Sequence, residues 1–232
     1  MQKNKIDISR IGKDKKNRTA AAQIITDRRD NQIVGFYPGP LLPGYVSQVK
    51  ALKNIFLAII SPEQVSRMLG YDKAYKQQQV PYIFDPGQMI PAFSAAQLRS
   101  AMSDAKILIG NDYEIRLILE KLSLTRADLL KKVEILVVTK GASGSEIYHG
   151  TSHMKIKAAR PRKVIDPTGA GDAYRAGLIK GLMKGYNLKT CGRLASLAAV
   201  YAVEQLGTQV HSFSLIDLQK RYYQNYRERL VI

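Results

Sequence analysis

The sequence predicts an α/β fold with a mostly parallel sheet, and two observations support this prediction. First, short apolar runs of strand length alternate with segments of helical pattern along most of the chain. Strands separated by helices of about ten residues are typical of β-α-β units, whose strands pair in parallel. Second, 45% of the 232 residues are hydrophobic and 24% are charged, which is ordinary for a globular protein with a substantial core.

The first predicted element is a β-hairpin. Residues 22–26 and 32–37 are rich in β-forming side chains, and residues 28–31 supply turn residues between them. Prolines and glycines then break the chain between residues 38 and 44. We therefore expect the hairpin to be separate from the α/β part that follows.

The later strands are expected at the apolar runs that follow this break. An antiparallel pair is expected after the last of the parallel strands. The expected parallel strands are residues 55–60, 80–84, 106–109 and 134–139, and the antiparallel pair is residues 145–148 and 153–156.

The expected helices begin mostly at capping patterns. Ser61, followed by proline and by Gln64, has the pattern of a serine N-cap with a side chain that reaches back. Ser94 with Gln97 is a second capping box, for a helix that ends near Met102. Further helices are expected over residues 111–122, 171–184 and 191–206, with Gly207 as the C-cap of the last one.

Composition narrows the range of functions. The formal net charge is +17, which is compatible with nucleic-acid binding, but the basic residues follow no periodic stripe and no nucleic-acid-binding signature is present. A proteome-wide bias to lysine and arginine, or attraction of a polyanionic small molecule, accounts for the charge as well. The chain has no apolar run long enough to cross a bilayer, no apolar signal segment at its start and a single cysteine. We therefore expect a cytoplasmic protein without a membrane partner.

Residues 164–177 form the most informative segment. An apolar strand end runs into a turn of small residues at Gly169, Ala170 and Gly171, and Asp172 then opens a helix. Unpaired amides at a helix N-terminus make an anion site that suits a phosphoryl group. A carboxylate beside that site can take a proton from an attacking hydroxyl. An ordinary strand-to-helix connection with an aspartate at the positive end of the dipole is the alternative.

The string from Asp166 to Gly177, Asp-Pro-Thr-Gly-Ala-Gly-Asp-Ala-Tyr-Arg-Ala-Gly, resembles the C-terminal signature of the ribokinase-like (PfkB) sugar and nucleoside kinases. The other motifs of this family occur in the same order and the resemblance covers most of the chain. It is strongest to the prokaryotic adenosine-kinase-like branch. It implies a three-layer α/β/α fold in residues 41–232, which bind ATP, and a partial β lid in residues 1–40.

The resemblance also implies roles for residues at the other strand ends. Asn111 and Glu114 would lie at the magnesium and phosphates, with Mg²⁺ held through water near Glu114, although the same pair also reads as a helix cap. Asp85 would face the phosphate channel, or belong to a plain turn. The residues implied to bind ATP are Thr139, Gly141 and Gly144 in a loop that could also be a simple hairpin turn, and Ser196 and Gly207 near the adenine.

We interpret the sequence as that of a kinase in which Asp172 is the general base and Gly169, Ala170 and Gly171 form the anion hole. It would transfer the γ-phosphoryl group of ATP, with Mg²⁺, to a ribosyl hydroxyl, most simply the 5′-hydroxyl of adenosine or a related nucleoside. The sequence contains no Gly-Gly pair, whereas the family carries one in its acceptor pocket. We therefore expect an N-terminally truncated member, whose sheet is covered by a partner or a second copy. A sugar kinase, an inactive remnant and a basic nucleic-acid-binding protein remain alternatives.

Overall fold

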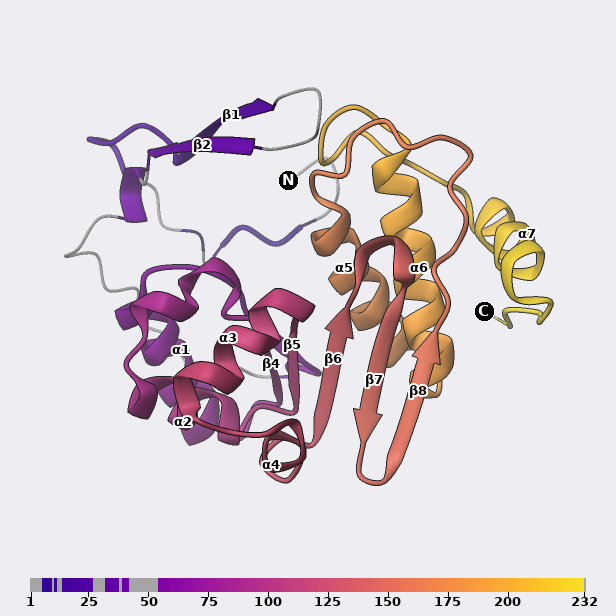
Figure 1. Ribbon diagram of the computed structural model, residues 1–232. Coiled ribbons are helices and arrows are strands. Elements are labelled where there is room, and N and C mark those ends of the chain that lie inside the picture. Colours follow the sequence, from indigo (N-terminus) through magenta and orange to yellow (C-terminus); the bar gives the residue numbers. More distant parts are fainter. Residues whose placement is uncertain are drawn as a thin grey trace.

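The computed structural model describes residues 6–9, 11, 14–26, 32–37, 39–41 and 54–231. Within these residues the main sheet has six strands in the order β3-β4-β5-β6-β7-β8 (Figure 1). The pairs from β3 to β6 are parallel, and β7 and β8 continue the sheet as an antiparallel pair. The strands are β3 (Ala58–Ile60), β4 (Tyr82–Phe84), β5 (Ile107–Asn111), β6 (Ile135–Thr139), β7 (Ser145–His149) and β8 (Ser152–Ile156).

Helices cover both faces of this sheet, so the predicted three-layer α/β/α architecture is confirmed. One face packs against α1 (Val65–Gln77), α2 (Ala95–Ser103), α3 (Asp112–Leu122) and the short α4 (Arg126–Leu130). The other face packs against α5 (Ala170–Met183) and α6 (Leu188–Val203). The last helix, α7 (Leu215–Tyr226), lies on the outer side of α6 (Figure 1). No helix among the described residues is long and apolar enough to cross a membrane.

Alternating residues of the central strands supply the two hydrophobic cores. Along β5, Leu108 faces the core beneath α1 to α3, whereas Ile107 and Ile109 face the core beneath α5 and α6. The same division holds for β6, where Leu136 and Val137 belong to opposite cores. Because side chains alternate across a strand, a run that is apolar at every position is buried on both faces. This is why these strands read as continuous hydrophobic runs.

The N-terminal hairpin is confirmed as a separate two-stranded sheet. Strand β1 (Ala21–Thr26) pairs antiparallel with β2 (Gln32–Tyr37). Figure 1 shows the hairpin on the side of the molecule where the parallel strands end. A short 3-10 turn, η2, follows at Gly39–Leu41. The predicted turn at residues 28–31 and most of the predicted break at residues 38–44 lie outside the described residues.

The predicted serine cap of the first helix is wrong. Helix α1 begins at Val65, and its N-cap, Gln64, makes no capping hydrogen bond with its side chain. Pro62 instead packs on Gly87, where an added Cβ would lie 2.5 Å from the proline Cγ. Residues 61–64 therefore run across the end of the sheet before the helix starts.

Two further boundaries differ from the sequence predictions. Only residues 58–60 of the predicted strand at residues 55–60 pair, because β3 has β4 as its partner and Pro81, which lacks an N–H donor, precedes β4. Gly207 is not the C-cap of α6, which ends at Val203 with Glu204 as its cap. The antiparallel pair β7-β8 and the capping box of α2 are confirmed.

The sequence analysis missed helices α4 and α7. Helix α7 has a serine N-cap, Ser214, whose side chain accepts a hydrogen bond from the Asp217 amide, 3.1 Å away. A serine followed by an aspartate three residues later was therefore the available signal.

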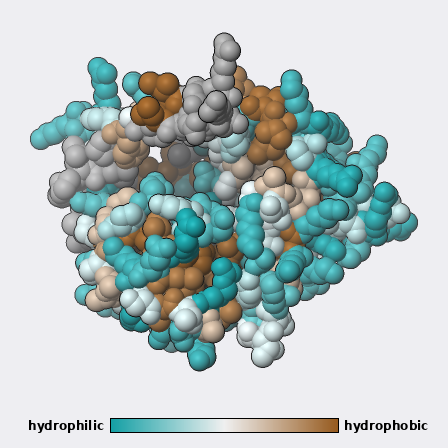
Figure 2. Space-filling view, in the orientation of Figure 1, coloured by the Kyte–Doolittle hydropathy of each residue, from teal (hydrophilic) through white to brown (hydrophobic). Residues whose placement is uncertain are grey.

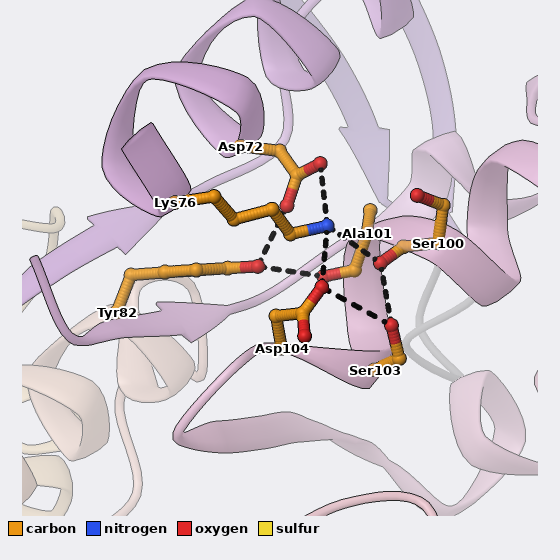
Figure 3. Close-up of polar contacts among 7 residues, drawn as sticks. All are labelled: Asp72, Lys76, Tyr82, Ser100, Ala101, Ser103 and Asp104. Atoms are coloured by element: carbon orange, nitrogen blue, oxygen red, sulfur yellow. Dashed lines mark hydrogen bonds and ion pairs between the residues drawn. The ribbon is translucent and has the colours of Figure 1, made fainter. Parts of the chain in front are cut away.

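A polar cluster around the buried side chains of Asp72 and Tyr82 ties α1 and α2 to the beginning of β4 (Figure 3). The Tyr82 hydroxyl donates to Asp72 Oδ1 at 2.6 Å, and Lys76 Nζ lies 3.0 Å from Asp72 Oδ2 and 2.9 Å from Asp104 Oδ2. Burial, together with the Asp72 carboxylate, raises the pKa of Tyr82. Tyr82 is the first residue of β4, and Asp85 directly follows the last one. The cluster therefore lies at the amino end of this strand, at the opposite edge of the sheet from Asp85.

Candidate active site

The register of the sheet brings the predicted site residues to one edge. Asn111 ends β5 and is the register partner of Thr139 at the end of β6. Thr139 is also the partner of Ser145, which begins the antiparallel strand β7. Asp85 directly follows β4. Ligand sites of open α/β sheets lie at this carboxyl edge of the parallel strands.

The turn before α5 is fastened to the end of α6. Asp166 accepts the Thr168 amide at 2.9 Å and the Gly207 amide at 3.0 Å, one on each carboxylate oxygen. The hydrogen bonds from Thr168, with that from Gly207, hold the pKa of Asp166 below its ordinary value. The amides of Ile165 and Asp166 both donate to the Val203 carbonyl. The Gly207 amide therefore helps to hold this turn in place through its hydrogen bond to Asp166.

Glycine is required at one position of this turn, and at a second position it leaves room for an arginine side chain. Gly169 is the N-cap of α5 with φ +82°, and an added Cβ would lie 3.0 Å from Thr208 Cβ. At Gly171 an added Cβ would lie 2.7 Å from a guanidinium nitrogen of Arg175. Among the described residues the amides of Gly169 and Gly171 have no hydrogen-bond acceptor, whereas the Ala170 amide donates to the Pro167 carbonyl at 3.2 Å. The Asp172 amide likewise has no acceptor among the described residues, so the open donors at this helix end are the amides of Gly169, Gly171 and Asp172.

Asp172 lies exposed in the first turn of α5, next to these donors. Its neighbour across the sheet edge is Asp85, which is 2% exposed and forms a two-pronged ion pair with Arg175. The distances are 2.5 Å from Nε to Oδ2 and 2.9 Å from Nη2 to Oδ1. Burial raises the pKa of Asp85, the Arg175 guanidinium opposes that rise, and the charges of Glu114 and Asp172 add to it. The carboxylates of Asp85, Glu114 and Asp172 and the guanidinium of Arg175 therefore lie together at the carboxyl edge of the parallel strands.

Sequence reasoning missed Arg175. The signal was its position three residues after Asp172, which places both side chains on one face of α5.

Asn111 and Glu114 form a complete capping box. The Asn111 side chain accepts the Glu114 amide at 2.8 Å, and Glu114 Oε2 accepts the Asn111 amide at 2.7 Å. Gly110 makes room for this arrangement, because an added Cβ would lie 3.1 Å from Glu114 Oε2. The helix-cap interpretation is confirmed. No three histidine, cysteine or carboxylate side chains of the described residues are grouped so as to hold a metal ion directly.

A cavity of about 560 Å³ lies between the loop after β6, the start of α5 and α6. The loop contains the 3-10 turn η4 (Gly141–Ser143), and an added Cβ at Gly144 would lie 2.1 Å from the Ile156 carbonyl oxygen. Of the predicted site residues, the cavity lining includes Thr139, Gly141, Gly144, Ala170, Gly171 and Ser196. Asp85, Asn111, Glu114, Gly169, Asp172 and Gly207 are not part of it.

Most of the rest of the cavity wall was not predicted. Residues 157–161 line one side, and the apolar residues Val164, Val200 and Val203 line another. Ser196 is buried, and its hydroxyl oxygen accepts the Ala159 amide at 2.8 Å. These residues are far apart in sequence and follow no common pattern, so only the fold could show that they meet.

Apolar surface surrounds the loops at this end of the molecule. Figure 2 shows it at the upper right, over the segments that lead into α5 and away from α6. The large exposed apolar residues of these segments are Val164, Ile165, Leu206, Val210 and Phe213.

A mostly parallel sheet between two helical layers, with a glycine turn that opens a helix beside a cavity, is the arrangement expected of a ribokinase-like kinase, and similar solved structures have this fold. The sequence model described as "pfkB family carbohydrate kinase" matches residues 1–214. The chain therefore belongs to the pfkB family of carbohydrate kinases, which are phosphotransferases with an alcohol acceptor.

Two curated relatives are nucleoside kinases from archaea. The chain is 33% identical over 206 residues to the nucleoside kinase of Methanocaldococcus jannaschii, and this match covers 89% of the chain and 68% of the relative. It is 36% identical over 210 residues to the nucleoside kinase of Methanothermobacter thermautotrophicus, with coverage of 88% and 66%. The chain thus spans about two thirds of the length of these relatives.

Solved structures of a nucleoside kinase from Burkholderia thailandensis are similar to the chain. The complex with inosine superimposes with a TM-score of 0.89 at 35% identity, over 93% of this chain and 72% of that protein. The complex described as ADP-inosine has a TM-score of 0.85 at 35% identity, over 92% of this chain and 67% of that protein.

Proposed function

We propose that the chain is an ATP-dependent nucleoside kinase that phosphorylates the ribosyl hydroxyl of adenosine or a related purine nucleoside. The observation that carries the proposal is the cavity that joins the glycine loop after β6 to the amino end of α5. Its apolar side suits a base and its small residues suit a close approach of phosphates. The similarity to nucleoside kinases, one of them bound to inosine and to ADP-inosine, supports the same assignment.

In this proposal the donor phosphates end at the amino terminus of α5. The amides of Gly169 and Gly171 bind the charge that develops on the transferred group, because they are unpaired donors at the positive end of a helix. Aligned amides stabilise such charge without having to reorganise during the reaction.

Asp172 is the general base of the proposed reaction. It accepts the proton of the acceptor hydroxyl while that oxygen bonds to the γ-phosphorus, the bond from the γ-phosphorus to the bridging oxygen breaks, and ADP leaves. Its exposed position in the first turn of α5 leaves the carboxylate accessible to an acceptor. Asp85 and Arg175 lie beside it and set the local charge.

The residues at the end of β5 fit a water-mediated magnesium site. Magnesium keeps several of its waters, so a single oriented carboxylate is a suitable partner for its hydration shell. Glu114 provides such a carboxylate, and the backbone N–H of Asn111 fixes its Oε2 by a hydrogen bond of 2.7 Å. When bound with ATP, the ion would neutralise phosphate charge.

We also propose that residues 1–40 belong to a lid over the acceptor. The hairpin carries exposed apolar side chains, with Ile25 72% and Ile33 75% exposed. It lies on the side of the molecule where the parallel strands end (Figure 1). A bound nucleoside would cover part of this apolar surface.

The test is ADP release from Mg-ATP in the presence of adenosine, inosine, other nucleosides or ribose, with the Asp172→Asn variant. We expect turnover with a purine nucleoside and a loss of about 10²- to 10⁴-fold in kcat in the variant, as for removal of a general base. Asp112→Asn is the matched control, since Asp112 is an exposed aspartate in the first turn of α3. Preference for ribose would indicate a sugar kinase. Absence of turnover by folded protein would contradict the proposal.

A further inference from the structure

The segment that walls one side of the cavity has no regular secondary structure. Residues 157–161 line the cavity, yet neither they nor Arg162 belong to a strand or helix. Residues 157 and 160–162 are exposed and only Ala159 is buried, so backbone groups of this segment that find no partner within a strand or helix bond to side chains or to water. Here the partners are side chains of the two helices behind the wall, α6 and α7.

Helix α7 makes three of these contacts. The Arg221 guanidinium donates to the Arg160 carbonyl at 3.0 Å, and the Asn225 side chain accepts the Arg160 amide at 2.7 Å. The Tyr226 hydroxyl donates to the Lys157 carbonyl at 3.3 Å. Both backbone groups of Arg160 are thereby held by one helix.

Helix α6 supplies the other two contacts. Ser196 accepts the Ala159 amide at 2.8 Å and Glu204 accepts the Arg162 amide at 2.5 Å. Five backbone groups between residues 157 and 162 are therefore bonded to side chains. The conformation of the wall depends on the position of these two helices.

Arg221 joins the two helices to the wall. It is 5% exposed, forms a two-pronged ion pair with Glu204 and lies 4.7 Å from the centre of the Tyr201 ring. Burial alone would raise the pKa of Glu204, but Arg221 and the Arg162 amide outweigh it and hold the pKa below its ordinary value. Charge-assisted, two-pronged pairs have a defined geometry, so Arg221 sets the distance between α6, α7 and the wall.

We propose that α7 braces the wall of the donor-nucleotide pocket and that Arg221 is the positioning residue of this brace. Helix α7 begins at Leu215, beyond the residues matched by the family model. The inference rests on the proposed function, because it takes the cavity to be the donor site. A wall held at both backbone groups of Arg160 stays at a constant distance from Val200 and Val203, which line the same cavity. A pocket whose wall is already in place binds a nucleotide without the entropic cost of first ordering a loop.

The test is the dissociation constant of ADP, measured by calorimetry, for the full chain and its variants. Arg221→Met removes the charge but keeps an apolar side chain of comparable length. We expect it to weaken ADP binding by about tenfold, equivalent to about 1.4 kcal/mol. Arg221→Lys should recover part of this loss, since one ammonium can replace only some of the bonds of the guanidinium.

Arg67→Met is the matched control. Arg67 is likewise a largely buried arginine, with its side chain 9% exposed, and it joins the Glu63 carboxylate to the backbone carbonyl of Pro40 in η2, but it lies on α1. We expect this variant to lower the thermal stability and to leave the ADP dissociation constant unchanged.

Asn225→Ala tests the same brace with less disturbance, should Arg221→Met fail to fold. It removes the acceptor of the Arg160 amide and should weaken ADP binding by about threefold, as for one neutral hydrogen bond. Unchanged ADP binding in folded Arg221→Met, or in Asn225→Ala, would overturn the brace. Absence of ADP binding by the wild-type protein would instead overturn the proposed function.

Discussion

At the scale of single residues, the pair of Asp85 and Arg175 is the main electrostatic feature of the candidate site. Asp85 is buried beside two other carboxylates, and Arg175 is the cation that balances it. Removing one partner of a buried ion pair leaves the other charge without compensation. The pair therefore holds α5, with its open amides, against the end of β4.

We expect Arg175→Met to lower the free energy of unfolding by about 3 kcal/mol, because Asp85 is left buried without its cation. The double variant Asp85→Asn/Arg175→Met should lose less than the sum of the two single variants, because the residues are coupled. Urea denaturation measures all three. Arg116→Met is the control, since its ion pair with Glu120 is 64% exposed on both sides and should change stability by less than about 0.5 kcal/mol. Strict additivity would contradict the coupling.

At the scale of secondary-structure elements, two helices begin with equivalent capping boxes. Ser94 caps α2 and Asn111 caps α3, and both boxes have their two reciprocal hydrogen bonds. Only the α3 cap lies at the carboxyl edge of the sheet, beside Thr139. The comparison of these helices can separate a structural role of Asn111 from a catalytic one.

We expect Asn111→Ala and Ser94→Ala each to lower the free energy of unfolding by about 1 kcal/mol, as for the loss of an N-cap. Only Asn111→Ala should also lower kcat. Asn111→Asp keeps a good cap and should retain stability, but it adds a negative charge beside the proposed phosphate site and should lower kcat. Full activity in both Asn111 variants would show that this residue is a cap alone.

At the scale of the whole molecule, the chain has a large excess of positive charge. A carboxylate that contacts several basic groups therefore contributes to stability by reducing the repulsion between them. The chain carries 36 lysines and arginines against 19 acidic residues. Glu146 on β7 lies 2.6 Å from Lys140 Nζ and also contacts Tyr148 and His153. The hydrogen bonds from Lys140 and then Tyr148 lower the pKa of Glu146 to about 2.

This lowered pKa predicts a contribution to acid stability. Because the pKa in the folded state lies below the ordinary value of 4.5, the stabilisation is complete above pH 4.5 and is lost as the pH falls towards 2. Glu146→Gln should lower the melting temperature at neutral pH and flatten its dependence on pH in this window. Thermal denaturation across the range measures this, with the exposed Glu120→Gln as control. Parallel profiles of the Glu146 variant and the wild-type protein would contradict the prediction.

The sequence by itself determined the fold class, the places of the central strands along the chain and the signature around Asp172. These features are local, because continuous apolar runs specify strands that are buried on both faces, and a glycine turn before a helix specifies open amides. Capping patterns predicted the starts of α2 and α3 for the same reason. Where the chain must cross the end of the sheet, as at Ser61, the local pattern was overruled by the packing of Pro62 on Gly87.

Only the tertiary structure decided which residues meet across long distances in the chain. The pairing of Asp85 with Arg175 joins two elements that are 90 residues apart, and the contact of Arg160 with Arg221 spans 61 residues. Ser196 supports the cavity wall through its hydrogen bond with the Ala159 amide, and Gly207 supports Asp166 through its own amide. Both contacts likewise join distant segments of the chain. Such contacts depend on how helices lie on the sheet, and no periodicity or short motif encodes that arrangement.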